Sequence, residues 1–291
     1  MIVNTREILE KAQAGGYAVG AFNTVNLETT HAILRAASTL RAPVIVQVTE
    51  KTLDYAGGRA IFHLIKDLSE CYYSNIPIGI HLDHGKSLEI VQRAVEIGFP
   101  SAMYDGSRKK YADNMAMTKK VVEFCHARSV CVQGELGSVP YLGETSMQSI
   151  NWDEYMTDPD EAKRFVDETG IDTLAVAIGN AHGFFAEREE PDYARLEAIR
   201  ERVNVPLVLH GASDWGVEKV ADVIRRGISC FNVDTATRIA FLGQITQLLR
   251  AGDETDIRKV LGSARESVES AVWEKIESFG SVGKAEEWKM K

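Results

Sequence analysis

The sequence lacks the features that define several common protein classes. It has no run of about twenty apolar residues, so we expect no membrane-spanning helix. Positive charge is scarce, because 33 Lys and Arg residues face 42 Asp and Glu residues and leave a net charge of −9. Such a chain offers no broad basic field for nucleic acid or an anionic membrane. The four cysteines are scattered without CxxC spacing, which favours reduced thiols in a cytoplasmic protein.

Two further absences narrow the fold. No glycine-rich dinucleotide fingerprint follows the first apolar run, which weighs against a doubly wound nucleotide-binding sheet. No low-complexity linker divides the chain, and 291 residues suit a single barrel domain over 1–291. The opening residues, MIVNTREILEKAQ, are typical of a short amphipathic helix rather than of a signal peptide.

Short apolar runs alternate with helical patterns along the whole chain. Near-continuous apolarity is typical of parallel strands that are covered on both faces. The eight runs are 17–24, 43–49, 76–83, 101–106, 130–136, 173–179, 206–211 and 230–235. Helical patterns between them include 27–40, 88–97, 112–127, 160–169, 193–202 and 217–226. Eight such units predict an α/β fold, the (β/α)8 TIM barrel, with extra C-terminal helices from about residue 256.

Three histidines share one position relative to the predicted strands. His84, His182 and His210 each precede a glycine, and they follow the third, sixth and seventh apolar runs. In a barrel the carboxyl ends of all strands meet at the face that carries the active site. A single histidine there is more often a core residue. Three at matching positions instead favour a catalytic zinc site with an open position for substrate.

Carboxylate and amide side chains are expected at the same face. Buried carboxylates are costly unless they are paired or bind a metal, so an ion pair is the alternative interpretation of each one. His81 shares a strand face with Asp83, and we interpret it as a residue that fills the barrel or supports the site. The set predicts a metal site beside a proton-transfer group. Its members are Asn23, Asp83, Asp105, Glu135, Asn232 and Asp234.

The loops after the last two strands have the composition of a phosphate site. Gly211, Ala212 and Ser213 follow the seventh strand, the pair Asp234–Thr235 ends the eighth, and Arg238 comes one turn later. Barrels commonly bind phosphate at this place, through loop N–H groups and a helix N-terminus. Glycine and serine are also common in loops without a ligand, so each residue alone is a weak signal.

Together these motifs resemble the class II fructose-bisphosphate and tagatose-bisphosphate aldolases. The matching pieces span almost the whole chain in family order: AFN at 21–23, HLDHG at 81–85, MYDGS at 103–107, GELG at 134–137, AVAIGNAHG at 175–183, LVLHGAS at 207–213 and NVDTATR at 232–238. The resemblance implies reversible cleavage of fructose 1,6-bisphosphate to dihydroxyacetone phosphate and glyceraldehyde 3-phosphate. Tagatose 1,6-bisphosphate or another phosphorylated keto sugar is the alternative substrate. A phosphosugar-binding barrel without catalysis and a metal-dependent hydrolase are remoter alternatives.

The resemblance also implies a metal set and catalytic residues. His84, His182 and His210 would hold Zn²⁺, and Asp105 and Glu135 would line a second divalent position. Asp83 would move the proton of the hydroxyl at the cleaved bond, and Asn232 would hold the enediolate. Glu144 matches the mobile acid that exchanges the carbon-bound proton of the substrate. A Na⁺ or K⁺ ion would lie near the phosphate.

Substrate contacts follow from the same resemblance. The dihydroxyacetone-phosphate half would lie on backbone and side chains of two motif loops, the aldehyde half near the second strand, and the distal phosphate on an arginine. A second arginine would come from the partner subunit of a homodimer or homotetramer. Thr49 would contact the aldehyde half, Arg238 would bind the distal phosphate, and Arg265 would be the arginine from the partner subunit. Asn23 is a further contact. The residues for the dihydroxyacetone-phosphate half are Gly183, Gly211, Ala212, Ser213, Asp234 and Thr235.

Some positions depart from the family pattern and leave the sugar open. Phe185 and Ala186 stand where fructose-bisphosphate enzymes usually carry a lysine, and Asn180 stands where threonine is usual. Asp234 instead fits the fructose-type enzymes, because tagatose-type enzymes tend to have alanine there. None of the eight strand runs contains lysine, which argues against Schiff-base catalysis and for the metal-dependent route.

Overall fold

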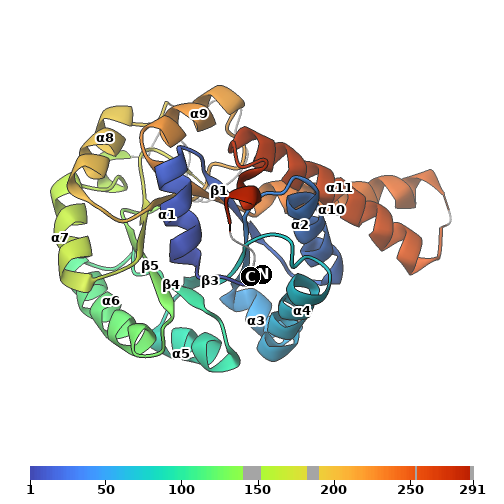
Figure 1. Cartoon of the computed structure of the whole chain (residues 1–291), viewed down its shortest axis with the longest axis horizontal. Coiled ribbons are helices and arrows are strands. Elements are labelled where there is room, and N and C mark those ends of the chain that lie inside the picture. The colour runs from blue at the N-terminus through green and yellow to red at the C-terminus, as the bar shows by residue number, and fades with distance from the viewer. Residues whose placement is uncertain (140–151, 182–189, 253, 289–291) are drawn as a thin grey trace.

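A computed structural model describes residues 1–139, 152–181, 190–252 and 254–288 of the chain. Eight parallel strands pair in chain order and close into a barrel, which confirms the predicted (β/α)8 fold (Figure 1). The strands are β1 Val19–Asn23, β2 Val44–Thr49, β3 Ile78–Gly85, β4 Ser101–Tyr104, β5 Cys131–Leu136, β6 Thr173–Val176, β7 Leu207–Leu209 and β8 Ile228–Val233. Their side chains are almost all buried, as expected for strands covered by helices outside and filled inside.

Outer helices cover the barrel and follow the predicted patterns closely: α2 Leu27–Thr39, α5 Leu88–Ile97, α6 Tyr111–His126, α7 Pro159–Thr169, α8 Tyr193–Arg202 and α9 Val217–Arg225. Three more helices were not named from the sequence: α3 Glu50–Ala56, α4 Gly58–Cys71 and α10 Thr235–Ala251. Gly57 separates α3 from α4 with a φ of 79°, a backbone conformation that residues with a side chain rarely adopt.

Helix α1, Thr5–Gly15, closes the amino-terminal end of the barrel (Figure 1). Ile8, Leu9 and Ala12 are fully buried and belong to an apolar cluster with Val19 of β1. The side chain of Asn4 accepts a hydrogen bond from the Arg6 N–H and caps the helix. The predicted N-terminal amphipathic helix is thus confirmed, and its apolar face serves as the floor of the barrel.

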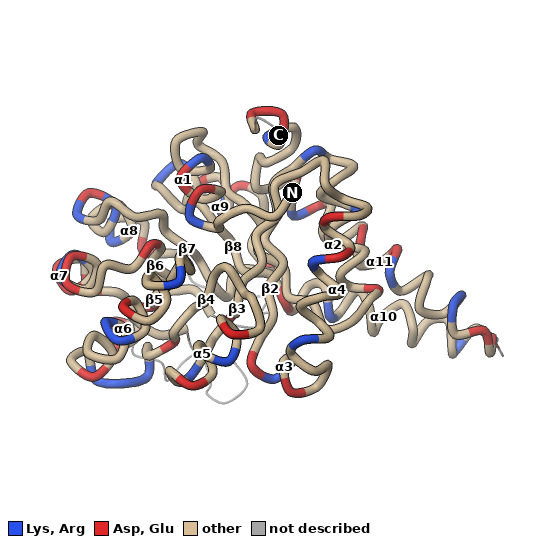
Figure 2. Tube along the Cα trace, turned by 60° about the horizontal axis from the view of Figure 1, so that its bottom comes forward, with Lys and Arg blue, Asp and Glu red and all other residues tan. Residues whose placement is uncertain are grey.

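Helices α10 and α11 (Ile257–Ser278) run side by side and project from the barrel (Figures 1 and 2). Their inner part rests on α2, against which α11 packs. Thr237 is the one buried residue of α10, and Ile239, Leu242 and Leu249 are exposed. The predicted C-terminal helical region is therefore present, and we name this pair of helices the arm.

The outer helices carry acidic and basic side chains interspersed (Figure 2). Among the described residues, no helix is both long enough and apolar enough to cross a membrane. All four cysteines are free, and Cys125, Cys131 and Cys230 are buried.

Candidate active site

His84 and His210 meet at the carboxyl end of the barrel. The Nε2 atom of His84, in β3, lies 3.0 Å from the Nδ1 atom of His210, which follows β7. His84 has a φ of 50°, in the left-handed region, next to a register shift between β3 and β4. A non-glycine residue in that region carries about 1 to 3 kcal/mol of strain, and such strain is often kept where a side chain must be aimed.

The outer nitrogen of each ring contacts an acceptor that orients the inner nitrogen. Nδ1 of His84 lies 2.7 Å from Oδ2 of Asp105, and Nε2 of His210 lies 3.2 Å from Oε1 of Gln133. When each outer nitrogen donates, each neutral ring turns a lone pair toward the other ring. Two converging lone pairs with carboxylate or amide oxygens behind them are typical of a metal site.

Three carboxylates surround His84. Ligand atoms of Asp83, His84 and His210 lie within 4.8 Å of one another, and so do those of His84, Asp105 and Glu135. The Oε2 atom of Glu135 is buried, lies 3.9 Å from Nδ1 of His84, and has no hydrogen-bond partner among the described residues. A buried acceptor of this kind fits a cation, so the donor set suits the metal that the sequence predicts.

The third predicted histidine, His182, lies outside the described residues, and so do Gly183 and Glu144. The two residues that precede it, Asn180 and Ala181, are nevertheless held next to His210 and Gly211. The side-chain amide of Asn180 donates to the His210 carbonyl over 2.9 Å. A Cβ atom at Gly211 would lie 2.7 Å from the carbonyl carbon of Ala181, so glycine is required for this close approach.

Asp83 is buried and held at both carboxylate oxygens. The amide of Asn23 donates to Oδ2 over 2.9 Å, and the amide of Asn232 donates to Oδ1 over 3.2 Å. Burial raises the pKa of Asp83, but His84, His210 and the hydrogen bond from Asn23 outweigh it and leave the pKa below its usual value. The ionised form of Asp83 is thus favoured beside the histidines, and an ionised carboxylate is able to accept a proton.

The same crowding perturbs the other groups. Burial lowers the pKa of His84, but Asp83, Asp105 and Glu135 reverse this and bring it to about 9. Burial, followed by repulsion from Asp105, raises the pKa of Glu135 to about 8. Burial also opposes ionisation of Asp105, yet His84 and Lys86, which hydrogen bond to it, hold its pKa below the usual range. Strong shifts around one point are typical of functional sites.

The predicted substrate residues that the structure describes lie on the same rim or on the arm. Thr49 pairs with Asp83 in the β2–β3 register and caps α3 by accepting from the Thr52 N–H. Gly211, Ala212 and Ser213 follow β7 directly, and Asp234 and Thr235 lead from β8 into α10. The structure thus places the loop residues at the carboxyl ends of strands, as the sequence indicates.

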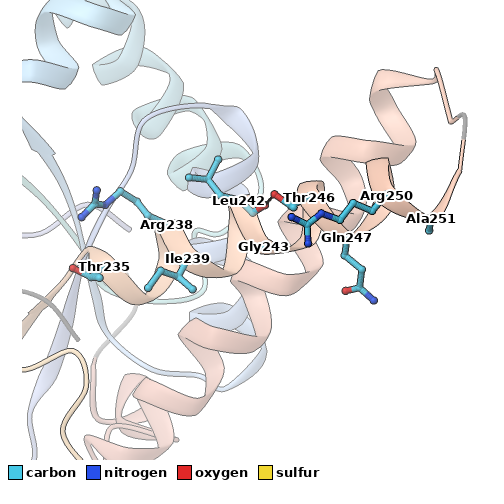
Figure 3. A pocket seen from close by; sticks show the side chains of 9 residues that line it. All are labelled: Thr235, Arg238, Ile239, Leu242, Gly243, Thr246, Gln247, Arg250 and Ala251. Atoms are coloured by element: carbon cyan, nitrogen blue, oxygen red, sulfur yellow. Dashed lines mark hydrogen bonds between the residues drawn. The ribbon is translucent and has the colours of Figure 1, made fainter. Parts of the chain in front are cut away.

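Arg238 and Arg265 both belong to the arm. Nε of Arg238 lies 3.0 Å from Oδ2 of Asp234, and the Arg238 side chain is 60% exposed. Arg238 lines an open groove of about 710 Å³ that runs along α10 (Figure 3). Arg265 is half-buried on α11, close enough to His31 of α2 to add to the effect of burial in lowering the pKa of that histidine.

Three contributors to the site were not named from the sequence. Gln47 donates to Oδ1 of Asn23 over 2.7 Å, Gln133 contacts His210, and Lys86 hydrogen bonds to Asp105. Gln47 and Gln133 are each the single amide of a largely apolar strand run. A buried amide needs hydrogen-bond partners, so that pattern was a usable signal.

Comparisons with known proteins agree with this geometry. A family model described as "Fructose-bisphosphate aldolase class-II" matches residues 3–284. The crystal structure of the YdjI aldolase from Escherichia coli K12 is 30% identical, with a TM-score of 0.87 over 98% of this chain and 100% of that one. A protein of Coccidioides immitis provisionally assigned as a fructose-1,6-biphosphate aldolase is also 30% identical, with a TM-score of 0.84 over 97% of this chain and 98% of that one.

A more distant structure supports the fold alone. Fructose-bisphosphate aldolase from Campylobacter jejuni is 21% identical, with a TM-score of 0.80 over 97% of each chain. The match of the family model to nearly the whole sequence, together with two solved structures at 30% identity, carries the assignment. The chain belongs to the class II fructose-bisphosphate aldolase family.

Proposed function

We propose that this protein is a zinc-dependent aldolase that reversibly cleaves fructose 1,6-bisphosphate to dihydroxyacetone phosphate and glyceraldehyde 3-phosphate. The observation that supports it best is the pair of facing nitrogens of His84 and His210, 3.0 Å apart, beside the buried carboxylate of Asp83. A metal position next to an ionised base is what the metal-dependent route of cleavage beside a ketone requires.

His84, His210 and His182 are proposed to hold the zinc ion, and Asp105 and Glu135 to line a second divalent position. Zinc, when bound, would act as a Lewis acid that stabilises negative charge next to the ketone. Asp105 also holds the ring of His84 through the 2.7 Å contact at Nδ1. This contact keeps Nε2 directed at the metal position.

Asp83 is proposed to accept the proton of the C4 hydroxyl as the C3–C4 bond breaks, and to return it in the synthetic direction. Its two oxygens are already fixed by Asn23 and Asn232, so little reorganisation precedes the transfer. Asn232, whose amide donates to Asp83, is proposed to hold the enediolate oxygen. Glu144 is proposed as the acid that exchanges the carbon-bound proton.

The phosphate of the dihydroxyacetone half is proposed to lie on loop N–H groups and on the start of α10, where the positive end of a helix dipole favours an anion. A Na⁺ or K⁺ ion would balance charge nearby. The loop residues are Gly183, Gly211, Ala212, Ser213, Asp234 and Thr235. Thr49 pairs with Asp83 in the strand register, which suits a contact with the aldehyde half.

The distal phosphate is proposed to bind Arg238, whose side chain is exposed beside the groove along α10. Arg265 is proposed to reach the site of a second subunit, in a homodimer or homotetramer. The exposed Ile239 and Leu242 of the arm offer apolar surface that such an assembly would cover.

The test is turnover of the zinc-loaded protein on fructose and tagatose 1,6-bisphosphates side by side, measured as kcat/KM. We expect the higher value for the fructose compound, loss of activity with chelator and recovery with zinc. Activity that survives complete metal removal, or that borohydride traps as a covalent adduct, would contradict the proposal.

A different phosphorylated keto sugar, with tagatose 1,6-bisphosphate first, is the second candidate. Asn180 favours it, because its amide holds the His210 carbonyl at a position where the fructose-type pattern has threonine. A panel of phosphorylated ketoses compared by kcat/KM decides between the two. Tight binding without turnover on any member would instead support a phosphosugar-binding barrel.

A further inference from the structure

A small closed cavity lies inside the barrel, one layer below Asp83. His81, two residues before Asp83 on the same face of β3, lines it together with Gln47 of β2 and Asn232 of β8. Thr5 and Leu9 of α1 line it as well. The space open to the centre of a water molecule is about 10 Å³. A single water needs about this much room.

Three buried polar atoms that belong to the lining residues have no hydrogen-bond partner in the described part of the chain. They are Nε2 of His81, Oε1 of Gln47 and Oδ1 of Asn232. Their residues are only 3%, 0% and 9% exposed. Each unsatisfied buried atom costs about 1 to 3 kcal/mol, so three around one cavity indicate a shared partner.

The neighbouring hydroxyls fix which of these atoms donates. The hydroxyl of Thr5 donates to Oγ of Ser101 over 2.8 Å. Ser101 then has its own hydrogen available for Nδ1 of His81, which lies 2.7 Å away. A neutral His81 that accepts at Nδ1 carries its proton on Nε2. The cavity therefore has one donor, at His81, and two acceptors, at Gln47 and Asn232.

We propose that His81, Gln47 and Asn232 bind one ordered water molecule, and that His81 is a positioning residue for Asp83. The water accepts from Nε2–H of His81 and donates to the oxygens of Gln47 and Asn232. Three hydrogen bonds are the usual number for a buried water. One donor and two acceptors use both hydrogens and one of the two lone pairs of a single water molecule.

The water acts on Asp83 because it sets the orientation of two amides. With its oxygen turned to the water, Asn232 directs its amide nitrogen to Oδ1 of Asp83. Gln47, oriented in the same way, donates to Asn23, and Asn23 donates to Oδ2 of Asp83. A flipped Asn232 amide would face the carboxylate with its oxygen, which is repulsive. The effect on catalysis rests on the proposed role of Asp83, whereas the water site does not.

The direct experiment is a high-resolution crystal structure of the zinc-loaded full-length protein. We expect a water peak about 2.7 to 3.2 Å from each of the three atoms. The proposal is overturned if the cavity holds no density, or if the peak is a metal cation by its anomalous signal and shorter contacts. This result is independent of any aldolase activity.

The second experiment separates positioning from packing. His81→Leu removes the donor, and His81→Gln restores an amide N–H. We expect the leucine variant to lose about 10- to 100-fold in kcat with KM within about twofold, as for other outer partners of a reacting group. The glutamine variant should recover most of the loss. Thr173→Val, which changes another residue of the cavity wall without removing the donor, serves as the matched control and should keep the parent kcat.

An unchanged kcat in His81→Leu, or an equal loss in the leucine and glutamine variants, would overturn the positioning role. If His81→Leu does not fold, Ser101→Ala gives the same test, because it removes the hydroxyl that holds the His81 tautomer. Should the parent protein have no aldolase activity at all, the proposed function fails while the water peak still decides the site.

Discussion

The two ends of the barrel differ in the polarity of the side chains that they bury. At the carboxyl end, Asp83, Asp105 and Glu135 are buried around His84, and the pKa of each departs from its usual value. At the amino end, α1 covers the barrel with apolar side chains such as Leu9. The amino end therefore supplies stability, and the carboxyl end bears the strain and buried charge that chemistry needs. The fold keeps these two demands apart in space.

The largest expected effect tests the carboxyl end. Asp83→Asn should lower kcat by about 10²- to 10⁴-fold, because the proton acceptor is lost while the shape is kept. Zinc content should be unchanged. The thermal midpoint should fall only modestly, because the interactions that lower the pKa of Asp83 are lost together with the cost of burying its charge. Steady-state kinetics measures kcat, metal analysis measures the zinc content, and calorimetry measures the thermal midpoint. Asp167→Asn, at an exposed ion pair with Lys163, is the control with parent activity. A large loss of stability in Asp83→Asn would break the comparison.

The next effect tests the amino end. Leu9→Ala should destabilise the protein by about 2 to 5 kcal/mol, because it leaves a cavity where the buried leucine side chain was. The kcat of the folded fraction should stay within about twofold of the parent value. Urea unfolding followed by fluorescence measures the loss. Val217→Ala, an exposed residue at the start of α9, should change stability by less than about 0.5 kcal/mol. Equal losses in the two variants would contradict the assigned floor.

A smaller effect concerns pH in the metal-free protein. Glu135 has its pKa raised to about 8, so charging it opposes folding increasingly from its ordinary pKa up to that value. His84 has its pKa raised to about 9, so its favourable contribution is present below its ordinary pKa and is lost as pH rises through 9. Both predict a lower urea midpoint at pH 9 than at pH 6.

Glu135→Gln sharpens this prediction, because it removes one of the two groups. In this variant the urea midpoint should fall less between pH 6 and pH 9 than it does in the parent. Adding zinc to the parent should also make this fall smaller, because the metal neutralises the charge of the carboxylates. If the metal-free protein is equally stable at both pH values, the pKa values of Glu135 and His84 are not raised as described.

The smallest effect is expected beyond the rim, on the arm. Arg238→Gln should raise KM for a ketose bisphosphate by about tenfold, which is about 1.4 kcal/mol. Stability should change by less than about 1 kcal/mol, because the pair with Asp234 is exposed. Arg250→Gln, in the same groove on α10, is the control and should leave KM unchanged. An unaltered KM in Arg238→Gln would remove Arg238 from the phosphate site.

The sequence predicted the barrel and the rim because both follow from short-range patterns. Eight apolar runs give the strands, and residues at strand ends must share one face, so His84 and His210 could be placed together before any distance was known. The helices over 50–71 were not named. Helix α3 has only seven residues and gives a short apolar pattern, whereas α4 carries an apolar stripe at Ile61, Ile65 and Leu68, so the signal for that helix was present in the sequence. Helix α10 buries only Thr237, so it carries no apolar stripe to detect.

Contacts across the barrel could not be predicted in the same way. The 3.0 Å approach of His84 to His210 depends on the left-handed backbone at His84 and on the closeness that Gly211 permits. Likewise, the link from Gln47 through Asn23 to Asp83 depends on strand register. Spacing along one chain carries no information on either. Roles that fall on His182, Gly183 and Glu144 stay predictions.

Helix α10 has a consequence for how substrate binding would be seen. It holds almost no buried side chain, so its backbone amides should exchange with solvent at far lower free energies than those of the barrel strands. Yet its first residue, Thr235, belongs to the proposed phosphate loop. A phosphate bound there would contact both the strand ends of the barrel, whose amides are well protected from hydrogen exchange, and a helix whose amides are poorly protected. Hydrogen–deuterium exchange should therefore slow along the first turns of α10 when a ligand binds, even if no atom of the barrel moves.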